Sequence, residues 1–314
     1  MNRALRLARK ALGMTSPNPL VGAVIVKSGR IISEGYRERP GLPHAEAVAL
    51  QRAGSGAKGA TLYVNLEPCC HLDKRTPPCA QAIIRAGIKR VVIGMIDPNP
   101  KVSGKGVELL RSAGIKVEVG LLEDRAKELN EIYIKHITTG MPFVILKVAM
   151  TLDGKIATEK GESKWITSLS SRKYVHRLRS TVDAVLTAIG TVMNTPPSTI
   201  IFTKNRAHPS LPEGVFVEYF DSERLDLREA MKRLYLRGIT SVLIEGGSSL
   251  NYYALRDGIV DKVLFFIAPK ILGGKDSIAS VGGVSKGLDS AWKLRDLRIR
   301  RLGEDILIEG YVEY

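Results

Sequence analysis

Residues 65–84, NLEPCCHLDKRTPPCAQAII, contain every cysteine of the chain, and they lie between an apolar strand pattern and a helical pattern. Cys69 and Cys70 are adjacent, and Cys79 follows a pair of prolines. A disulfide framework uses an even and dispersed set of cysteines, so this cluster favours a reducing compartment instead. The stretch therefore predicts a turn between a strand and a helix that carries thiol ligands for a metal, with the remaining ligand supplied from elsewhere.

Strand and helix patterns alternate through the first half of the chain. The expected strands are residues 21–27, 30–36, 61–67, 89–96 and 115–122, and the expected helices are 44–53, 80–87, 106–114 and 123–137. Strands separated by helices of this length predict a sheet with helices on both faces. The basic N-terminus is compatible with a transit peptide or with a first amphipathic helix. We favour the helix, because the strand pattern VGAVIV follows almost immediately.

A domain boundary is expected at residues 138–143, where Gly140 and Pro142 stop the preceding helical pattern. Beyond it, the expected strands are 142–158, 184–190, 199–204, 241–247 and 261–269, the expected helices are 171–180, 226–238 and 249–258, and a closing hairpin spans 293–314. The sequence thus predicts two α/β domains in tandem, residues 1–140 and 141–314, a number that suits a chain of 314 residues.

Composition limits the partners of the chain. No run approaches the ~18 consecutive apolar residues of a membrane span, so no membrane partner is expected, and cysteine usage favours a cytoplasmic location. The net charge is +15, with 22 basic and 12 acidic side chains in residues 1–140 and 25 and 20 in residues 141–314. This excess raises nucleic acid as a partner, although a basic protein that handles phosphorylated metabolites has the same composition.

The missing metal ligand is expected at His44, in the segment PHAEAVAL at the start of a helix. His44 with two cysteines would give zinc three protein ligands and leave a fourth position for water, which is typical of catalytic zinc. Cys79 in the first turn of a helix lies near backbone N–H groups that stabilise thiolate. Bound zinc lowers the pKa of its water towards ~7, and Glu46 could pass the proton of that water to a departing amine.

Zinc nucleobase deaminases use this chemistry, with an H-x-E followed by P-C-x-x-C. Here the second cysteine comes ten residues after Cys69. NPLVGAVIV, PHAEAVAL and LEPCCHLDKRTPPC resemble the deaminase half of the bifunctional riboflavin-biosynthesis deaminase–reductase family. The resemblance implies a cytidine-deaminase-like α/β/α domain with a catalytic glutamate, zinc ligands and substrate-binding residues. These residues are Glu46 as the catalytic group, His44, Cys69 and Cys79 as ligands of Zn²⁺, and Asn18 and His71 at the substrate.

Cys70 is an alternative to Cys69 as the ligand. Cys69 follows Glu67 and Pro68 as the family ligand does, whereas choosing Cys70 restores the family spacing to the last cysteine. We favour Cys69 and expect Cys70 to be a small buried thiol. The histidines outside this cluster are expected at the surface, and they are His136, His176 and His208.

The second half resembles the reductase half of the same family, which has a dihydrofolate-reductase-like fold. FVILKVAMTLDGKIAT, GESKWITS, GTV and EGGSSLNYYAL carry this resemblance. No G-x-G-x-x-G follows a strand, but a strand runs into two glycines and a helix, where a phosphate can approach backbone N–H groups. The resemblance implies that NADPH contacts Ala149, Trp165, Thr167, Thr191, Gly246, Gly247 and Ser248, and that the substrate contacts Ser163, Arg179 and Glu245. Arg179 suits the phosphate of that substrate.

The second half also departs from the family. After GTV this chain reads MNTPPS and passes directly to TIIFTK, so Thr195 stands where the family has an aspartate. Several dozen residues of loop and strand are missing, and in the family they contribute to both pockets. The sequence therefore predicts a shortened reductase-like domain after residue 195, whose activity does not follow from the resemblance.

The favoured function is riboflavin biosynthesis. The chain would deaminate 2,5-diamino-6-ribosylamino-4(3H)-pyrimidinone 5′-phosphate with zinc, and then reduce the ribose of 5-amino-6-(5-phosphoribosylamino)uracil with NADPH. The alternatives are a deaminase with a non-catalytic second domain, a nucleic-acid-editing deaminase, and a zinc-stapled interaction module. The long cysteine loop and the EGGSSL segment favour a phosphoribosyl-pyrimidine over nucleic acid as the partner. A homo-oligomer is compatible with the sequence.

Overall fold

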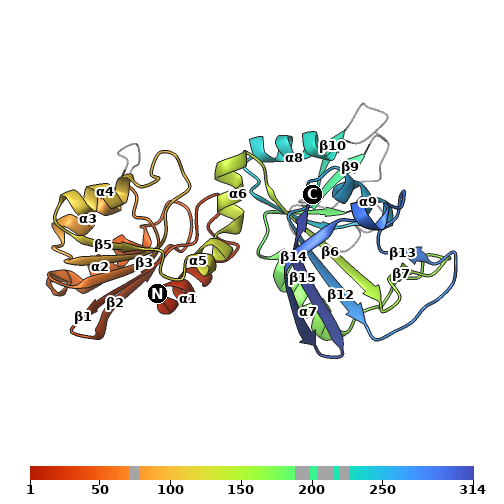
Figure 1. Ribbon diagram of the computed structural model, residues 1–314, viewed down its shortest axis with the longest axis horizontal. Coiled ribbons are helices and arrows are strands. Elements are labelled where there is room, and N and C mark those ends of the chain that lie inside the picture. Colours follow the sequence, from red (N-terminus) through yellow and green to blue (C-terminus); the bar gives the residue numbers. More distant parts are fainter. Residues whose placement is uncertain (71–77, 188–198, 204–214, 220–225) are drawn as a thin grey trace. The chain divides into compact units, whose positions relative to one another are not determined.

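The computed structural model describes residues 1–70, 78–187, 199–203, 215–219 and 226–314, the two short ranges by their backbone alone. The chain divides into two compact units, Met1–Gly140 and Met141–Tyr314 (Figure 1). Among the residues singled out from the sequence, His71, Thr191, Thr195 and His208 lie outside the described ranges. No helix in the described part of the chain is long and apolar enough to cross a membrane.

Unit 1 is a five-stranded sheet with the order β2-β1-β3-β4-β5 between two layers of helices. Its strands are β1 Gly22–Lys27, β2 Arg30–Tyr36, β3 Thr61–Leu66, β4 Arg90–Met95 and β5 Lys116–Val119. Its helices are α1 Asn2–Arg9, α2 Ala45–Ala53, α3 Cys79–Arg85, α4 Lys105–Ser112, α5 Glu123–Leu129 and α6 Glu131–Thr139. Strand β1 pairs antiparallel with β2 and β3, whereas β3, β4 and β5 are parallel. Helices α1 and α5 pack together on one face, and α2, α3 and α4 form the other layer.

Burial on both faces explains why the central strands are almost continuously apolar. Two glycines let helices cross the sheet at backbone distance, since a Cβ on Gly22 would lie 2.2 Å from the carbonyl oxygen of Ala4 and one on Gly35 would lie 2.3 Å from that of Ala45. The alternating α/β organisation predicted for this half is therefore present, with a helical layer on each side of the sheet.

The helix expected over residues 123–137 is instead two helices, α5 and α6, which meet at Asn130. The Asn130 side chain is buried and bonds to a distant segment: its Oδ1 accepts from the N–H of Leu20 at 2.8 Å, and its Nδ2 donates to the carbonyl of Leu20 at 3.1 Å. Asn65 also donates to that carbonyl, at 2.9 Å. The break therefore comes from a tertiary contact that fixes the segment next to Asn18.

Unit 2 is an eight-stranded sheet with the order β10-β9-β8-β11-β6-β12-β15-β14 and a small β13-β7 pair. Its strands are β6 Phe143–Thr151, β7 Lys155–Ala157, β8 Ala184–Thr187, β9 Thr199–Thr203, β10 Val215–Tyr219, β11 Ser241–Glu245, β12 Lys262–Ala268, β13 Ile278–Ala279, β14 Lys293–Leu302 and β15 Asp305–Glu313. Its α-helices are α7 Leu169–Arg179, α8 Leu227–Leu236 and α9 Ser248–Arg256. The sheet is parallel from β10 to β12, and β15 pairs antiparallel with β12 and β14.

Helices cover both faces of this sheet. Apolar residues of α8 and α9 pack against alternate positions of β6 that include Val144, Leu146 and Val148. Tyr174 of α7 contacts Phe266, which pairs with Ala149 and so points to the opposite face. The predicted α/β class is confirmed for both units. In unit 2 the strand expected over 142–158 is divided into β6 and β7, and β10 and β13 were not predicted.

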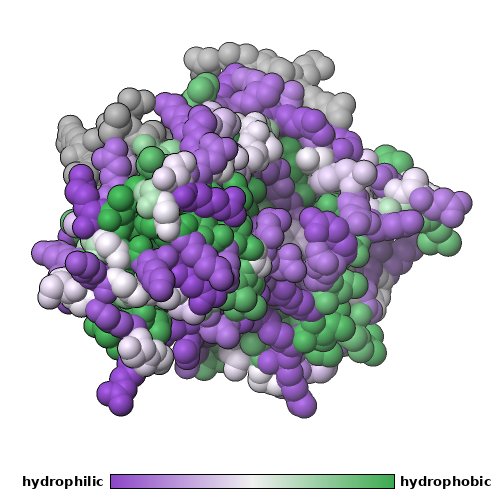
Figure 2. Space-filling view, turned by 60° about the vertical axis from the view of Figure 1, so that its left-hand side comes forward, coloured by the Kyte–Doolittle hydropathy of each residue, from purple (hydrophilic) through white to green (hydrophobic). Residues whose placement is uncertain are grey.

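The molecular surface is mainly polar. Figure 2 shows hydrophilic side chains over most of the viewed face, with smaller apolar areas between them. Lysine and arginine outnumber aspartate and glutamate in the chain, 47 to 32, which gives it a net charge of +15. Surface ion pairs such as that between Arg90 and Glu118, at 2.6 Å, contribute little to stability because water screens them.

Candidate functional site

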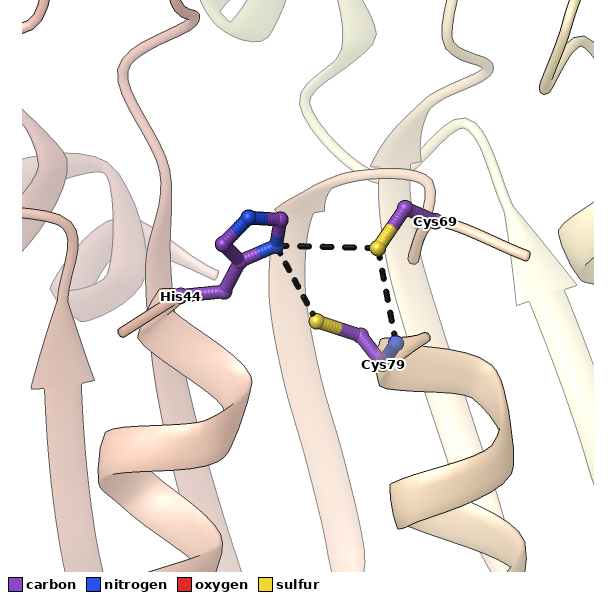
Figure 3. Close-up of side chains that lie close together, drawn as sticks. All are labelled: His44, Cys69 and Cys79. Carbon is purple, nitrogen blue, oxygen red and sulfur yellow. Dashed lines mark hydrogen bonds between the residues drawn. The ribbon is translucent and has the colours of Figure 1, made fainter. Parts of the chain in front are cut away.

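Three side chains from separate elements converge in unit 1 (Figure 3). His44 is the N-cap of α2, Cys69 lies in the turn after β3, and Cys79 is the first residue of α3. The Nδ1 of His44 lies 3.6 Å from the Sγ of Cys69 and 3.2 Å from the Sγ of Cys79. Their ligand atoms all lie within 4.8 Å of one another. The two helix N-termini and the strand end thus bring one nitrogen and two sulfurs to one point.

The two sulfur atoms interact with each other. The N–H of Cys79 donates to the Sγ of Cys69 at 3.4 Å. The side chain of Cys79, hydrogen-bonded to Cys69, lowers the pKa of Cys69 to about 3, and the same bond raises the pKa of Cys79 well above its ordinary value. Ligand atoms around tetrahedral zinc lie roughly 3.5–3.8 Å apart, close to the distances between His44 and the two sulfurs. The donor set therefore fits zinc.

Cys70 does not belong to this cluster. Its side chain is half-buried and packs against the apolar core of unit 1. Burial raises the pKa of the Cys70 thiol, and its sulfur is not among the ligand atoms that meet at His44. Of the two adjacent cysteines, the geometry therefore selects Cys69 for the cluster.

Glu46 lies beside the cluster at the wall of a cavity of about 230 Å³. Its side chain is only 3% exposed, and burial raises the pKa of its carboxyl group. Asn18, which the resemblance implies as a substrate-binding residue, also lines this cavity. The same cavity thus has the buried carboxyl group of Glu46 and two of the three candidate ligands, His44 and Cys69, in its wall.

Several further cavity residues were missed in the sequence. Arg37 is 8% exposed, and its Nη1 lies 3.3 Å from the Nε2 of His44. Asp97 accepts from the hydroxyl of Tyr133 at 2.9 Å. His136, expected at the surface, is half-buried and lines the cavity, so that prediction was wrong. The position of Asp97 could have been inferred, because it follows a parallel strand beside β3 and so ends at the same sheet edge as Cys69.

Unit 2 contains a buried group of charges at the carboxyl ends of its parallel strands. Arg179, the last residue of α7, donates to both carboxylate oxygens of Glu245 at the end of β11, with a shortest distance of 2.6 Å. The Arg179 and Glu245 side chains are 20% and 7% exposed. Burial lowers the pKa of the neighbouring Lys147, and the charge of Glu245 opposes this effect. Lys147 was missed because it lies within an otherwise apolar strand.

The other residues predicted to bind cofactor or substrate lie on several segments. Ala149 and Thr167 are half-buried, Ser163 is exposed, and Trp165 is 62% exposed with the guanidinium of Arg172 lying 4.2 Å from its ring centre.

The two glycines of the turn after β11 differ in the space around them. A Cβ on Gly246 would lie 2.6 Å from Leu250, whereas one on Gly247 meets no atom within 4 Å. Gly247 is the N-cap of α9, and Ser248 is its first residue. The helix start therefore has open space in front of it, where a ligand could approach the backbone.

Family profiles match both units. The profile described as "Cytidine and deoxycytidylate deaminase zinc-binding region" matches residues 1–95, and that described as "RibD C-terminal domain" matches residues 142–209 and 192–308. Riboflavin biosynthesis protein RibD of Aquifex aeolicus is 43% identical, with 98% of this chain and 96% of that protein covered. The chain belongs to the RibD family. The Escherichia coli protein is 38% identical, with 98% and 97% covered.

Solved structures of the RibD family have the same architecture. Acinetobacter baumannii RibD matches with a TM-score of 0.89 and 37% identity, covering 100% of this chain and 98% of that one. A Thermotoga maritima structure, named a diaminohydroxyphosphoribosylaminopyrimidine deaminase/5-amino-6-(5-phosphoribosylamino)uracil reductase, matches with a TM-score of 0.88 and 38% identity, covering 100% and 97%. The cytidine-deaminase-like and reductase-like domains inferred from the resemblance are therefore confirmed.

This chain and its Aquifex relative differ in length. The alignment with the Aquifex protein runs over 347 positions, so at least 33 of them (347 − 314) have no counterpart in this chain. The match to the RibD C-terminal profile is divided into two parts that overlap at residues 192–209. The Aquifex relative therefore has residues that this chain lacks.

Proposed function

We propose that this chain catalyses both reactions named for the Thermotoga relative, as a deaminase and reductase of riboflavin biosynthesis. Its substrates are 2,5-diamino-6-ribosylamino-4(3H)-pyrimidinone 5′-phosphate and, after deamination, 5-amino-6-(5-phosphoribosylamino)uracil. The observation that carries the proposal is the meeting of one histidine and two cysteines beside a cavity that contains a buried glutamate. The full-length match to the RibD family supports the second activity.

In the deaminase unit, His44, Cys69 and Cys79 would hold Zn²⁺ through Nδ1 and the two Sγ atoms. When bound, zinc supplies the Lewis acidity that activates a water molecule for attack on the pyrimidine. Glu46 accepts a proton of that water and donates it to the leaving amino group, so that C2 gains oxygen, the C2–N bond breaks and ammonia departs. Its raised pKa suits both halves of this transfer. The buried Arg37 contributes positive charge to the cavity wall, which suits an anionic substrate.

In the reductase unit, NADPH would supply the hydride that opens the ribose at C1′. The open N-terminus of α9 at Gly247 and Ser248 offers backbone N–H groups to a phosphate of the cofactor. Both carboxylate oxygens of Glu245 accept from Arg179, so Arg179 holds Glu245 in place. Its guanidinium would also contact the substrate phosphate. Lys147 places a second cation beside the same carboxylate.

We expect Glu245→Gln to remove reduction and to leave deamination unchanged. The neutral amide leaves the half-buried Arg179 and Lys147 without their counter-charge, so unit 2 also loses stability, by about 1–3 kcal/mol. NADPH oxidation and ammonia release, measured on the same preparation, separate the two activities. Glu229→Gln is the matched control, because its pair with Arg233 is 46% and 44% exposed and contributes less than about 1 kcal/mol. Equal loss of both activities in Glu245→Gln would contradict the assignment.

The deaminase assignment is tested by ammonia release from the diaminopyrimidine ribotide. Zinc-loaded protein should release ammonia, protein stripped with a chelator should not, and added zinc should restore the reaction. Release that is independent of zinc would contradict the assignment of the cluster. Binding of oligonucleotides that falls steeply with salt, without reaction of the ribotide, would instead favour the nucleic-acid-editing alternative.

A further inference from the structure

We propose that Glu67 is a positioning residue of the deaminase unit, whose carboxylate holds the segment 97–107 against the turn that carries Cys69 and so sets the distance between the metal ligands and the opposite wall of the cavity. The inference rests on the proposed deaminase function. It concerns a buried carboxylate that the mechanism above does not use, although it lines the same cavity as Glu46.

Both oxygens of Glu67 are occupied by backbone donors. The side chain is 3% exposed and lies two residues before Cys69. Its Oε2 accepts from the N–H of Asp97 at 3.2 Å and from that of Gly104 at 3.0 Å, and its Oε1 accepts from the N–H of Val107 at 3.1 Å. Because these bonds use both oxygens of the carboxylate, Glu67 acts as a structural acceptor.

Glu67 supplies the N-terminal cap that α4 lacks. The N-cap of α4 is Gly104, at φ 80°, and no side chain caps the helix locally. The first N–H groups of a helix need an acceptor and favour negative charge, and Glu67 reaches them from β3. The contact is close, since a Cβ on Gly106 would lie 2.2 Å from the carbonyl oxygen of Pro68 and 3.1 Å from the Oε1 of Glu67.

The segment that Glu67 holds forms one wall of the cavity. Asp97, Asn99 and Val102 line it. The Oδ1 of Asp97 accepts from the N–H of Asn99 at 2.9 Å and from the hydroxyl of Tyr133 at 2.9 Å. One carboxylate therefore connects the turn of Cys69 to the polar groups across the cavity, and a change at Glu67 acts on the substrate through them.

The test is Glu67→Gln in the full chain. A glutamine has one acceptor and one donor, so its NH₂ faces either the N–H of Val107 or those of Asp97 and Gly104. Because a displaced wall weakens substrate binding equally in the ground and transition states, we expect KM for the ribotide to rise about tenfold while kcat changes less than about threefold. Zinc per chain should stay at the wild-type value, and amide exchange at Gly104 and Val107 should accelerate.

A pair of glycine variants keeps the test decisive if Glu67→Gln does not fold. Gly104 and Gly114 both have φ 80° and open space around a Cβ, and they lie at opposite ends of α4. Alanine strains the backbone at either position, but only Gly104 donates to Glu67. We expect Gly104→Ala to raise KM and Gly114→Ala to leave KM unchanged.

The outcomes separate this inference from the proposed function. Wild-type KM in a folded Glu67→Gln protein, loss of zinc from it, or equal effects of the two glycine variants would overturn the positioning role. A wild-type protein that does not deaminate the ribotide overturns the proposed function instead. In that case amide exchange at Gly104 and Val107 still decides whether Glu67 holds the segment.

Discussion

Glu46→Gln is expected to lower kcat for deamination by about 10²–10⁴-fold, the usual contribution of a positioned proton carrier. The amide keeps the size of the side chain at this buried position, but it can neither accept the proton of water nor deliver one to the leaving amine. Zinc per chain and NADPH-dependent reduction should remain at wild-type values. Ammonia release, metal analysis and NADPH oxidation on one preparation measure all three quantities.

Glu38→Gln is the control for this substitution, because Glu38 is exposed and its replacement should leave every one of these quantities unchanged. A zinc-stapled interaction module predicts that Glu46→Gln also changes nothing. Wild-type deamination by that variant would therefore contradict the proton-transfer role of Glu46.

Cys69→Ser is expected to remove zinc and deamination together, whereas Cys70→Ser should keep both. Residues outside the ligand shell already change metal affinity 10–100-fold, so loss of a thiolate ligand should weaken zinc binding by more than ~100-fold. Cys70 is the matched control, because it is adjacent in sequence but packs against the core away from the cluster. Metal analysis after dialysis at neutral pH gives zinc per chain for both variants. Zinc retained by Cys69→Ser and lost from Cys70→Ser would reverse the assignment.

The strand and helix order was predictable, because apolar periodicity and Gly or Pro stops are local properties of the sequence. The departures have tertiary causes. Asn130 divides a continuous helical pattern because its side chain bonds to Leu20, 110 residues away. The turn between β6 and β7 contains Asp153, whose carboxylate accepts from the N–H groups of Leu272 and Gly273. Neither contact can be inferred from the neighbouring sequence.

The part of the site that lies in short sequence motifs was predictable. His44, Glu46 and the cysteines belong to short segments with a chemical meaning, and the fold brings the histidine to Cys69 and Cys79. The sequence did not reveal Arg37, Asp97 and Lys147. Each of them stands out only by its burial and by its contacts with residues of other elements. Arg179 was expected at a phosphate, and its bidentate pair with Glu245 is visible only in three dimensions.

Mass spectrometry of the product formed from the diaminopyrimidine ribotide, with NADPH present and absent, tests the central claim most directly. We predict that the product has one amino group replaced by oxygen whether or not NADPH is present. It should gain hydrogen at the ribose only when NADPH is present. A deaminated product that stays unreduced with NADPH would contradict the bifunctional assignment and favour a deaminase with a non-catalytic second unit. An unchanged ribotide would contradict the account of the zinc site.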